Sequence, residues 1–129
     1  MRQCLVIDDS RVIRTIASSI FKSLECSVCE AETGIEGLDF CRVHMPDVIL
    51  LDMQMPSMSS VEFLRSLRRS PGGQHPYVIL ATVENDVLRL TEVLSAGADE
   101  YVMKPFDRAA LEAKLVRTTR AANSASALA

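Results

Sequence analysis

Polar side chains that could take part in phosphoryl or metal chemistry follow short apolar runs in this sequence. Asp8 and Asp9 follow the first run, and Asp52 closes the third. Thr82 and Lys104 stand at the ends of the fourth and fifth runs. An ionised carboxylate at the end of a buried strand is unfavourable unless another group neutralises it. Taken singly, each residue could also be a helix cap or an ordinary loop residue.

Together, these five side chains match the needs of a site that accepts a phosphoryl group. Three neighbouring carboxylates would repel one another and raise one another's pKa values. A divalent cation relieves such repulsion, and Mg²⁺ commonly binds one or two carboxylates with waters and phosphate oxygens. A lysine can neutralise a phosphoryl oxygen, and a threonine hydroxyl can donate a hydrogen bond to another. An Asp carboxylate can form a covalent acyl phosphate.

The elements that would position these residues alternate along the chain. Val48–Leu51 is apolar without alternation, which is typical of a parallel strand buried on both faces. Stretches with helical spacing separate the runs, so we expect a parallel sheet with helices on both faces. The C-terminal strand ends then share one edge, where ligands bind. The five predicted strands are residues 3–7, 27–31, 48–52, 76–81 and 100–103.

Helical spacing also predicts which residues of the five helices face the sheet. The first helix is strongly amphipathic, with Asp9 or Ser10 as its cap. The fourth begins at Asn85 or Asp86 and ends at Gly97. The residues predicted to face inward are Val12, Ile13, Ile16, Ala17, Ile20, Phe21, Leu24, Leu38, Cys41, Val61, Leu64, Leu67, Val87, Leu90, Val93, Leu94, Ala110, Leu111, Leu115 and Val116.

Composition restricts the class of protein. The 129 residues, 48% hydrophobic and 24% charged, are typical of one globular domain. The net charge of −3 offers no basic surface for nucleic acid. No apolar run is long enough to span a membrane, and the N-terminus does not resemble a signal peptide, so we expect a cytoplasmic protein. Cys26 and Cys29 form a lone CxxC pair, and we expect all 4 cysteines to be free thiols.

The motifs resemble the receiver domain of two-component response regulators, and more narrowly the single-domain CheY-like chemotaxis response regulators. The resemblance implies a flavodoxin-like, doubly wound parallel sheet of five strands in the order 2-1-3-4-5, with five helices. It implies one receiver domain over residues 1–122, followed by a short flexible tail at residues 123–129. The matching segments are Val6–Ser10, Leu50–Pro56, Thr82, Gly97–Tyr101 and Lys104–Phe106.

The resemblance also implies roles for single residues in the phosphoryl site. Asp52 would be the phosphoacceptor for a sensor histidine kinase or a phosphotransfer protein. Asp9, Asp52 and the backbone carbonyl of Gln54 would bind Mg²⁺, with Asp8 acting through water. Lys104 would pair with Asp52 and then with the phosphoryl group.

A second group of implied roles concerns the switch. Thr82 would move toward the phosphoryl group, and Tyr101 would turn inward behind it. The bond between Lys104 and Pro105 would be cis. The change would bias a face built from the fourth helix, the fifth strand and the fifth helix. Residues on or near that face would include Arg89, Glu92 and Arg108.

The sequence departs from the family pattern in two places. Ser59-Ser60 stands where the family often has Asp-Gly, and serine tolerates an unusual backbone conformation less well than glycine. Val83 follows the switch threonine, where the family usually has a small residue. We hypothesise that this stiff, β-branched side chain hinders access to the phosphoryl group and changes its transfer rates. Gln54 and Glu84 flank the same space and could orient or block an attacking water.

Three classes of function remain open. The first is a monomeric signalling module that acts on a protein target such as a flagellar switch component, or serves as a phosphate sink or relay carrier, without contacting DNA or a membrane. The second is a phosphatase, but Gln54 stands where many such enzymes have an acidic Asp, and an amide cannot protonate a leaving group. The third is a receiver-like scaffold that no longer responds to phosphorylation and binds a nucleotide messenger, through another basic patch or through the arginines predicted to lie on an exposed face, Arg65, Arg68 and Arg69.

Overall fold

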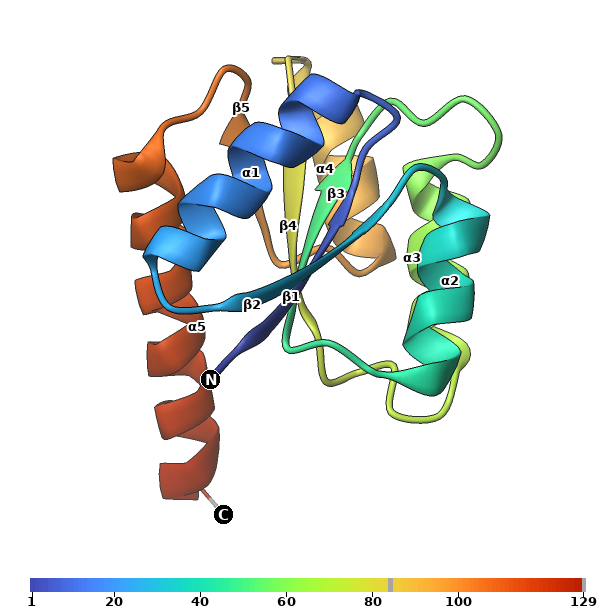
Figure 1. Cartoon of the computed structure of the whole chain (residues 1–129). Helices are drawn as coiled ribbons and strands as arrows, with labels where there is room; N and C mark the ends of the chain where they lie inside the picture. The colour runs from blue at the N-terminus through green and yellow to red at the C-terminus, as the bar shows by residue number, and fades with distance from the viewer. Residues whose placement is uncertain (84, 129) are drawn as a thin grey trace.

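Five parallel strands form the centre of the molecule, in the order β2-β1-β3-β4-β5. A computed structural model describes residues 1–83 and 85–128, with side chains described as far as Thr118 (Figure 1). The predicted fold and strand order are confirmed. The elements are β1 (Gln3–Ile7), α1 (Arg11–Ser23), β2 (Ser27–Ala31), α2 (Gly34–Val43), β3 (Val48–Asp52), α3 (Ser60–Arg69), β4 (Tyr77–Thr82), α4 (Val87–Ala96), β5 (Glu100–Met103) and α5 (Arg108–Leu128).

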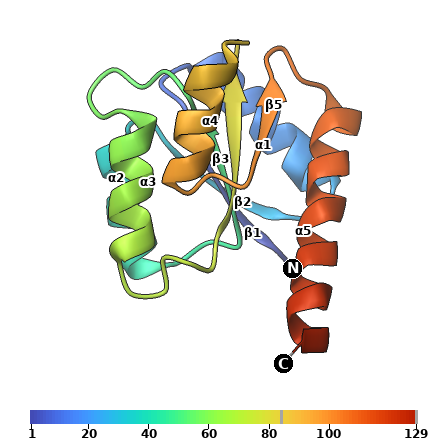
Figure 2. The ribbon, with the colours of Figure 1, turned by 180° about the vertical axis from the view of Figure 1, so that it is seen from behind.

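Helices cover both faces of the sheet. Helices α1 and α5 lie on one face, and α2, α3 and α4 lie on the other (Figures 1 and 2). The core is accordingly divided into two clusters, one between the sheet and each layer of helices. Every residue of β3 is buried, because this central strand has neighbours on both sides and helices above and below. The apolar run that precedes Asp52 follows from this double burial.

The predicted start of α1 and both predicted ends of α4 agree with the structure. Ser10 is the cap of α1 and accepts a hydrogen bond from the Ile13 backbone N–H at 3.3 Å. Asp86 caps α4 in the same way, through the Leu88 N–H at 3.0 Å. Gly97 ends α4 with a φ of 135°, a conformation that residues with a Cβ rarely adopt.

The prediction that Val12 and Ile16 pack inward is wrong. Their exposed fractions are 67% and 43%, whereas Arg14 and Ser18 are buried on the same helix. Helix α1 turns the face that carries Arg14 and Ser18 toward the sheet, because both side chains bond to Glu30 on the edge strand β2. The spacing of apolar residues along α1 gives no indication that a polar partner lies on β2. The inward positions assigned to Val87 and Val116 are also wrong, since both side chains are exposed.

The sequence suggested that Arg68 lies on a solvent-exposed face, but in the structure its side chain is largely buried. Its Nε and Nη2 atoms donate to the Gly97 carbonyl at 3.0 and 2.7 Å, and Nη1 donates to the carbonyls of Gly73 and Pro76 at 2.9 and 2.8 Å. Nη2 also pairs with Asp99 at 3.0 Å. The guanidinium therefore joins the end of α3 to the loop before β4 and to the end of α4.

The cysteines are all free, as predicted. Cys4, Cys26 and Cys41 are buried, and only Cys29 on β2 is exposed. Helix α5 continues past residue 123, so regular structure extends further than the sequence suggested, while the domain boundary at residue 122 stays a prediction. Within the described residues, none of the helices has the length and apolar character needed to cross a membrane.

Candidate functional site

The C-terminal ends of β1, β3, β4 and β5 meet at one edge of the sheet and enclose a cavity of about 290 Å³. The strands are parallel and adjacent, so the residue that follows each strand arrives at the same edge. All five residues predicted to converge are found here. The cavity is lined by Asp8, Asp9, Ser10, Asp52, Gln54, Thr82, Val83 and Lys104.

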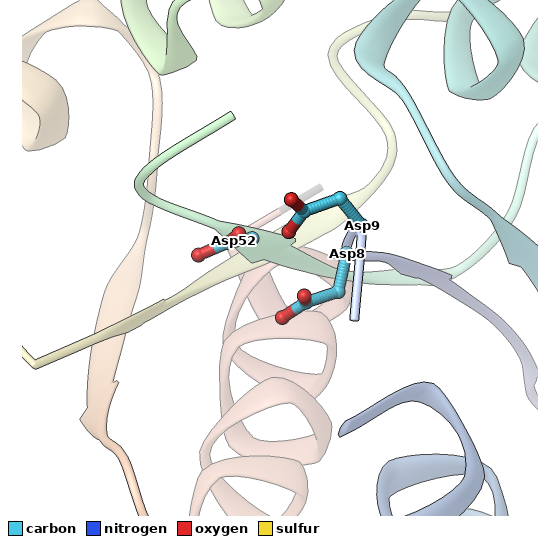
Figure 3. Close-up of side chains that lie close together, drawn as sticks. All are labelled: Asp8, Asp9 and Asp52. Atoms are coloured by element: carbon cyan, nitrogen blue, oxygen red, sulfur yellow. The ribbon is translucent and has the colours of Figure 1, made fainter. Parts of the chain in front are cut away.

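Three carboxylates form the acidic part of the site (Figure 3). One oxygen from each of Asp8, Asp9 and Asp52 lies within 4.8 Å of the other two. Asp8 and Asp52 are buried, whereas Asp9 is exposed. Within the described part of the chain, the Asp9 carboxylate makes no hydrogen bond or ion pair.

Lys104 provides the positive charge of the site. Its Nζ atom donates to Asp8 Oδ2 at 2.8 Å and to Asp52 Oδ1 at 3.0 Å. Burial, followed by the Asp8 charge, raises the pKa of Asp52 despite the contacts with Lys104. Burial alone would lower the pKa of Lys104, but its bonds to the two carboxylates raise that pKa overall. One ammonium faces three carboxylates, so this set of hard oxygen donors fits a divalent cation such as Mg²⁺.

The start of α3 supports the Asp52 end of the site. The buried Ser60 hydroxyl donates to the Met53 carbonyl at 2.6 Å and contacts the Asp52 carbonyl at 3.4 Å. The Ser59 side chain caps α3 by accepting from the Glu62 N–H at 3.1 Å. Ser60, which stands in the place of the family's glycine, is the first residue of α3 and has no positive φ, so the serine introduces no strained conformation here.

Thr82 and Val83 lie on the other side of the cavity. Thr82 is buried at the end of β4. The Val83 side chain lines the cavity and has an exposed fraction of 61%. Gln54 lies opposite, and its backbone N–H donates to Asp52 Oδ1 at 3.2 Å. Glu84, which was predicted to flank this space, lies outside the described residues.

Tyr101 lies away from the cavity, partly exposed on β5. The Lys114 Nζ atom of α5 is 5.8 Å from the centre of its ring. Lys114 and Arg117 both form ion pairs with the neighbouring Glu100. The peptide bond between Lys104 and Pro105 is cis.

Sequence reasoning missed two hydrogen bonds that support the acidic turn, which is the turn after β1 that carries Asp8 and Asp9. Arg14 donates to the Asp8 carbonyl at 2.8 Å, and the Ser10 backbone N–H donates to Asp8 Oδ1 at 2.9 Å. A signal for Arg14 was present, because a charged residue stands at a position of α1 that faces the sheet. Its acceptors, however, lie in the turn after β1 and on β2, and could not be identified from α1 itself.

Comparisons with known proteins agree with this geometry. Residues 4–116 match the model of the response regulator receiver domain. The chain is 40% identical over 116 residues to the response regulator MprA of Mycobacterium sp. (strain KMS), covering 88% of this chain and 47% of that protein. It is 28% identical over 107 residues to the chemotaxis protein CheY of Halobacterium salinarum, covering 83% of this chain and 88% of that protein.

A solved structure shows the same arrangement. The chemotaxis response regulator CheY4 of Vibrio cholerae superposes with a TM-score of 0.86 at 29% identity, covering 92% of this chain and 98% of that chain. The chain spans about half the length of the first curated relatives it matches. The family match extends over most of the chain and includes the C-terminal ends of all the strands that form the site. The chain therefore belongs to the family of response regulator receiver domains.

Proposed function

We propose that this protein accepts a phosphoryl group on the Asp52 carboxylate from a sensor histidine kinase or a phosphotransfer protein. The observation that carries the proposal is the position of Asp52, buried at the end of β3 and bonded to Lys104 beside two further carboxylates. In the transfer, an Asp52 oxygen forms a bond to phosphorus while the N–P bond of a phosphohistidine breaks. The electron pair of that bond leaves with the imidazole nitrogen.

Lys104 and Thr82 are proposed to stabilise the phosphorylated form. The Lys104 ammonium already lies 3.0 Å from Asp52 Oδ1, so it can pair with a phosphoryl oxygen attached there. Thr82 lines the same cavity, and its hydroxyl can donate a hydrogen bond to another phosphoryl oxygen. Both side chains would stabilise the negative charge that the phosphoryl group brings to Asp52.

Mg²⁺ is the proposed cofactor, because the donor set consists of carboxylate oxygens that a single lysine does not neutralise. Asp9, Asp52 and the backbone carbonyl of Gln54 would bind the ion directly, and Asp8 would bind it through water. When bound, the ion would neutralise the negative charge of the carboxylates and of the phosphoryl oxygens. The exposed Asp9 carboxylate is free for this purpose within the described residues.

The proposed output is a change in protein binding at the face formed by α4, β5 and α5. Movement of Thr82 and Tyr101 on phosphorylation would bias this face between two arrangements. Its exposed apolar side chains, Val87, Leu88 and Met103, suit contact with a protein partner. Arg89, Glu92 and Arg108 add charged groups near it.

We propose chemotaxis or motility signalling as the setting, with a flagellar switch component as the target. The similarity to the CheY of Halobacterium salinarum, which the chain covers over 88% of its length, supports this assignment. The protein would act as a monomer in the cytoplasm, in keeping with its four free thiols. It would act without contacting DNA or a membrane. A phosphate sink, a relay carrier or a nucleotide-binding scaffold is the alternative output.

The phosphoacceptor is tested by incubating the protein with Mg²⁺ and acetyl phosphate and recording the intact mass. We expect the gain of one phosphoryl group, which disappears in Asp52→Asn and when EDTA removes the metal. A gain that persists in Asp52→Asn would show that another residue is modified. Continuous turnover of an added phosphomonoester would instead indicate a phosphatase.

The output is tested with beryllofluoride, which mimics the phosphoryl group on Asp52 in the presence of Mg²⁺. We expect the beryllofluoride form to bind a flagellar switch component more tightly than the unmodified protein does. Equal binding in the two forms would favour a phosphate sink or a relay carrier. Calorimetry with nucleotides tests the scaffold, although Arg68 is already engaged by four backbone bonds and Asp99.

A further inference from the structure

Arg14 is a buried cation that the proposed phosphoryl chemistry does not use. Its exposed fraction is 7%, and it projects from α1 toward the sheet. A buried guanidinium is unfavourable unless its donors are matched, so its partners indicate what it does. Nε donates to Glu30 Oε1 at 3.1 Å, and Nη2 lies 3.5 Å from Glu32 Oε1. The Ser18 hydroxyl donates to the other Glu30 oxygen at 3.1 Å.

The third partner of Arg14 belongs to the candidate cation site. Nη1 donates to the Asp8 carbonyl oxygen at 2.8 Å. This carbonyl is part of the peptide unit that joins Asp8 to Asp9, so the bond fixes the plane of that peptide. Glu30 and Glu32 hold the guanidinium in place from the edge of the sheet. The orientation of the acidic turn thus depends on a network that reaches β2.

The other polar atoms of Asp8 are also bonded. Its N–H donates to the Ala31 carbonyl at 3.1 Å. Oδ1 accepts from Ser10 and Oδ2 accepts from Lys104. Arg14 supplies the remaining bond, to the carbonyl oxygen. Asp8 is therefore fixed at every polar atom before any cation is considered.

Asp9 differs from Asp8, because its exposed carboxylate makes no polar contact within the described residues. Its position relative to Asp8 and Asp52 depends on the backbone that carries it. Rotation of the peptide before Asp9 would move the Asp9 carboxylate away from the carboxylates of Asp8 and Asp52, which now have oxygens within 4.8 Å of it. A bond that prevents this rotation lowers the free energy needed to assemble the oxygen ligands.

We infer that Arg14, held by Glu30, is a positioning residue for the cation site. It keeps the peptide between Asp8 and Asp9 in the orientation that directs both carboxylates toward Asp52. The inference rests on the proposed function, since it assumes that these carboxylates bind a divalent cation. Groups that orient metal ligands commonly change metal affinity about 10- to 100-fold when they are removed.

Arg68 provides a matched control for Arg14. It is also a largely buried arginine that donates to backbone carbonyls and pairs with a carboxylate. Its acceptors at Gly73, Pro76 and Gly97 do not line the acidic cavity. Loss of either guanidinium removes comparable interactions, but only Arg14 contacts the turn that carries Asp8 and Asp9.

The experiment measures Mn²⁺ binding, which uses the same oxygen ligands and is followed through the electron paramagnetic resonance signal of the free ion. We expect the dissociation constant of Arg14→Met to rise about tenfold, and that of Arg68→Met to stay within about twofold of the unaltered protein. Unchanged affinity in Arg14→Met, or an equal loss in both variants, would overturn the inference. Absence of binding by the unaltered protein would overturn the cation site itself, and the inference with it.

A second readout separates positioning from general loss of structure. In the acetyl phosphate reaction, Arg14→Met should need about tenfold more Mg²⁺ for half-maximal phosphorylation, yet reach a similar rate when Mg²⁺ is saturating. A rate that stays low at saturating Mg²⁺ would contradict a positioning role. If Arg14→Met does not fold, Arg14→Lys serves instead, because an ammonium lacks the planar fork that spans Asp8 and Glu30. Its Mn²⁺ affinity should fall several-fold, and unchanged affinity would overturn the inference.

Discussion

At the scale of single residues, Asp52 is placed where its charge is unfavourable. It is 5% exposed, shares Lys104 with Asp8 and has a raised pKa because of burial and the Asp8 charge. The same features suit a nucleophile whose charge Lys104 offsets in part and a bound cation would offset further. Stability and function are therefore in conflict at this position.

Replacement of Asp52 by Asn should stabilise the metal-free protein at neutral pH. The pKa of Asp52 is higher in the folded than in the unfolded state, so its contribution to stability is present below the unfolded pKa and is lost as pH rises through the folded pKa. We expect Asp52→Asn to melt a few degrees higher than the unaltered protein at pH 7 in EDTA, and the difference to shrink as Asp52 becomes protonated. Thermal melts followed by circular dichroism at pH 4 and 7 provide the measurement.

The control for this prediction is Asp39→Asn, since Asp39 is exposed and, among the residues that the structure describes, pairs only with Arg42 of its own helix. That substitution should change the melting temperature little at either pH. A lower melting temperature for Asp52→Asn at pH 7 would mean that its bond with Lys104 outweighs burial.

Val83 is the second residue whose effect can be measured directly. Its side chain lines the cavity beside Thr82 and is stiff at χ1. We expect Val83→Ala to speed loss of the phosphoryl group about fivefold, corresponding to about 1 kcal/mol in the activation barrier. The rates of phosphorylation by acetyl phosphate and of subsequent decay, both followed by intact mass, would test this, and equal rates would exclude a steric role.

At the scale of secondary-structure elements, the buried Arg14 and the largely buried Arg68 add polar connections between segments that also pack against one another. Arg14 joins α1 to the turn after β1 and to the edge strand β2. Arg68 joins the end of α3 to the loop before β4 and to the end of α4. Each satisfies carbonyls that no regular element satisfies, which is why these charges are tolerated inside the protein.

Loss of Arg68 should destabilise the fold without altering the phosphoryl site. Arg68→Met leaves the Gly97, Gly73 and Pro76 carbonyls without this donor, and we expect the free energy of unfolding to fall by about 2 kcal/mol. Urea unfolding followed by circular dichroism provides the value. Arg69→Met is the control, because Arg69 is exposed and, in the described part of the chain, bonds only to Arg65 of its own helix, so its loss should cost less than about 0.5 kcal/mol.

At the scale of the whole molecule, the sheet separates two cores of buried side chains. Cys41 lies in the core under α2, α3 and α4, while Cys4 and Cys26 lie in the core under α1 and α5. Burial raises the pKa of Cys41 to about 11, and burial also raises the pKa of Cys4. Cys29, on the outer strand β2, lies outside both cores.

Thiol labelling should therefore distinguish one cysteine from the other three. With 5,5′-dithiobis(2-nitrobenzoate) at pH 8, we expect one thiol to react quickly in the folded protein and all 4 to react in guanidinium chloride. Cys29→Ser should remove the fast phase. A fast phase that persists in Cys29→Ser would show that one of the cores opens on the timescale of labelling.

The sequence by itself determined the order and type of the elements and the residues that end each strand. Strand identity depends on runs of apolar residues, and the parallel order brings the strand ends to one edge. Asp8, Asp9, Asp52, Thr82 and Lys104 could therefore be assigned to one site from local patterns. Their specific roles remain proposals that the mass measurement tests.

Only the tertiary structure decided which helix faces are buried and which charges are paired. Val12 and Ile16 are exposed, although they continue an apolar pattern, because Arg14 and Ser18 occupy the inner face of α1 through their bonds to Glu30. Arg68 is bonded to Gly97, a residue 29 positions away along the chain. A buried polar group is stabilised by its partners rather than by its neighbours in sequence, so its position follows from the assembled fold.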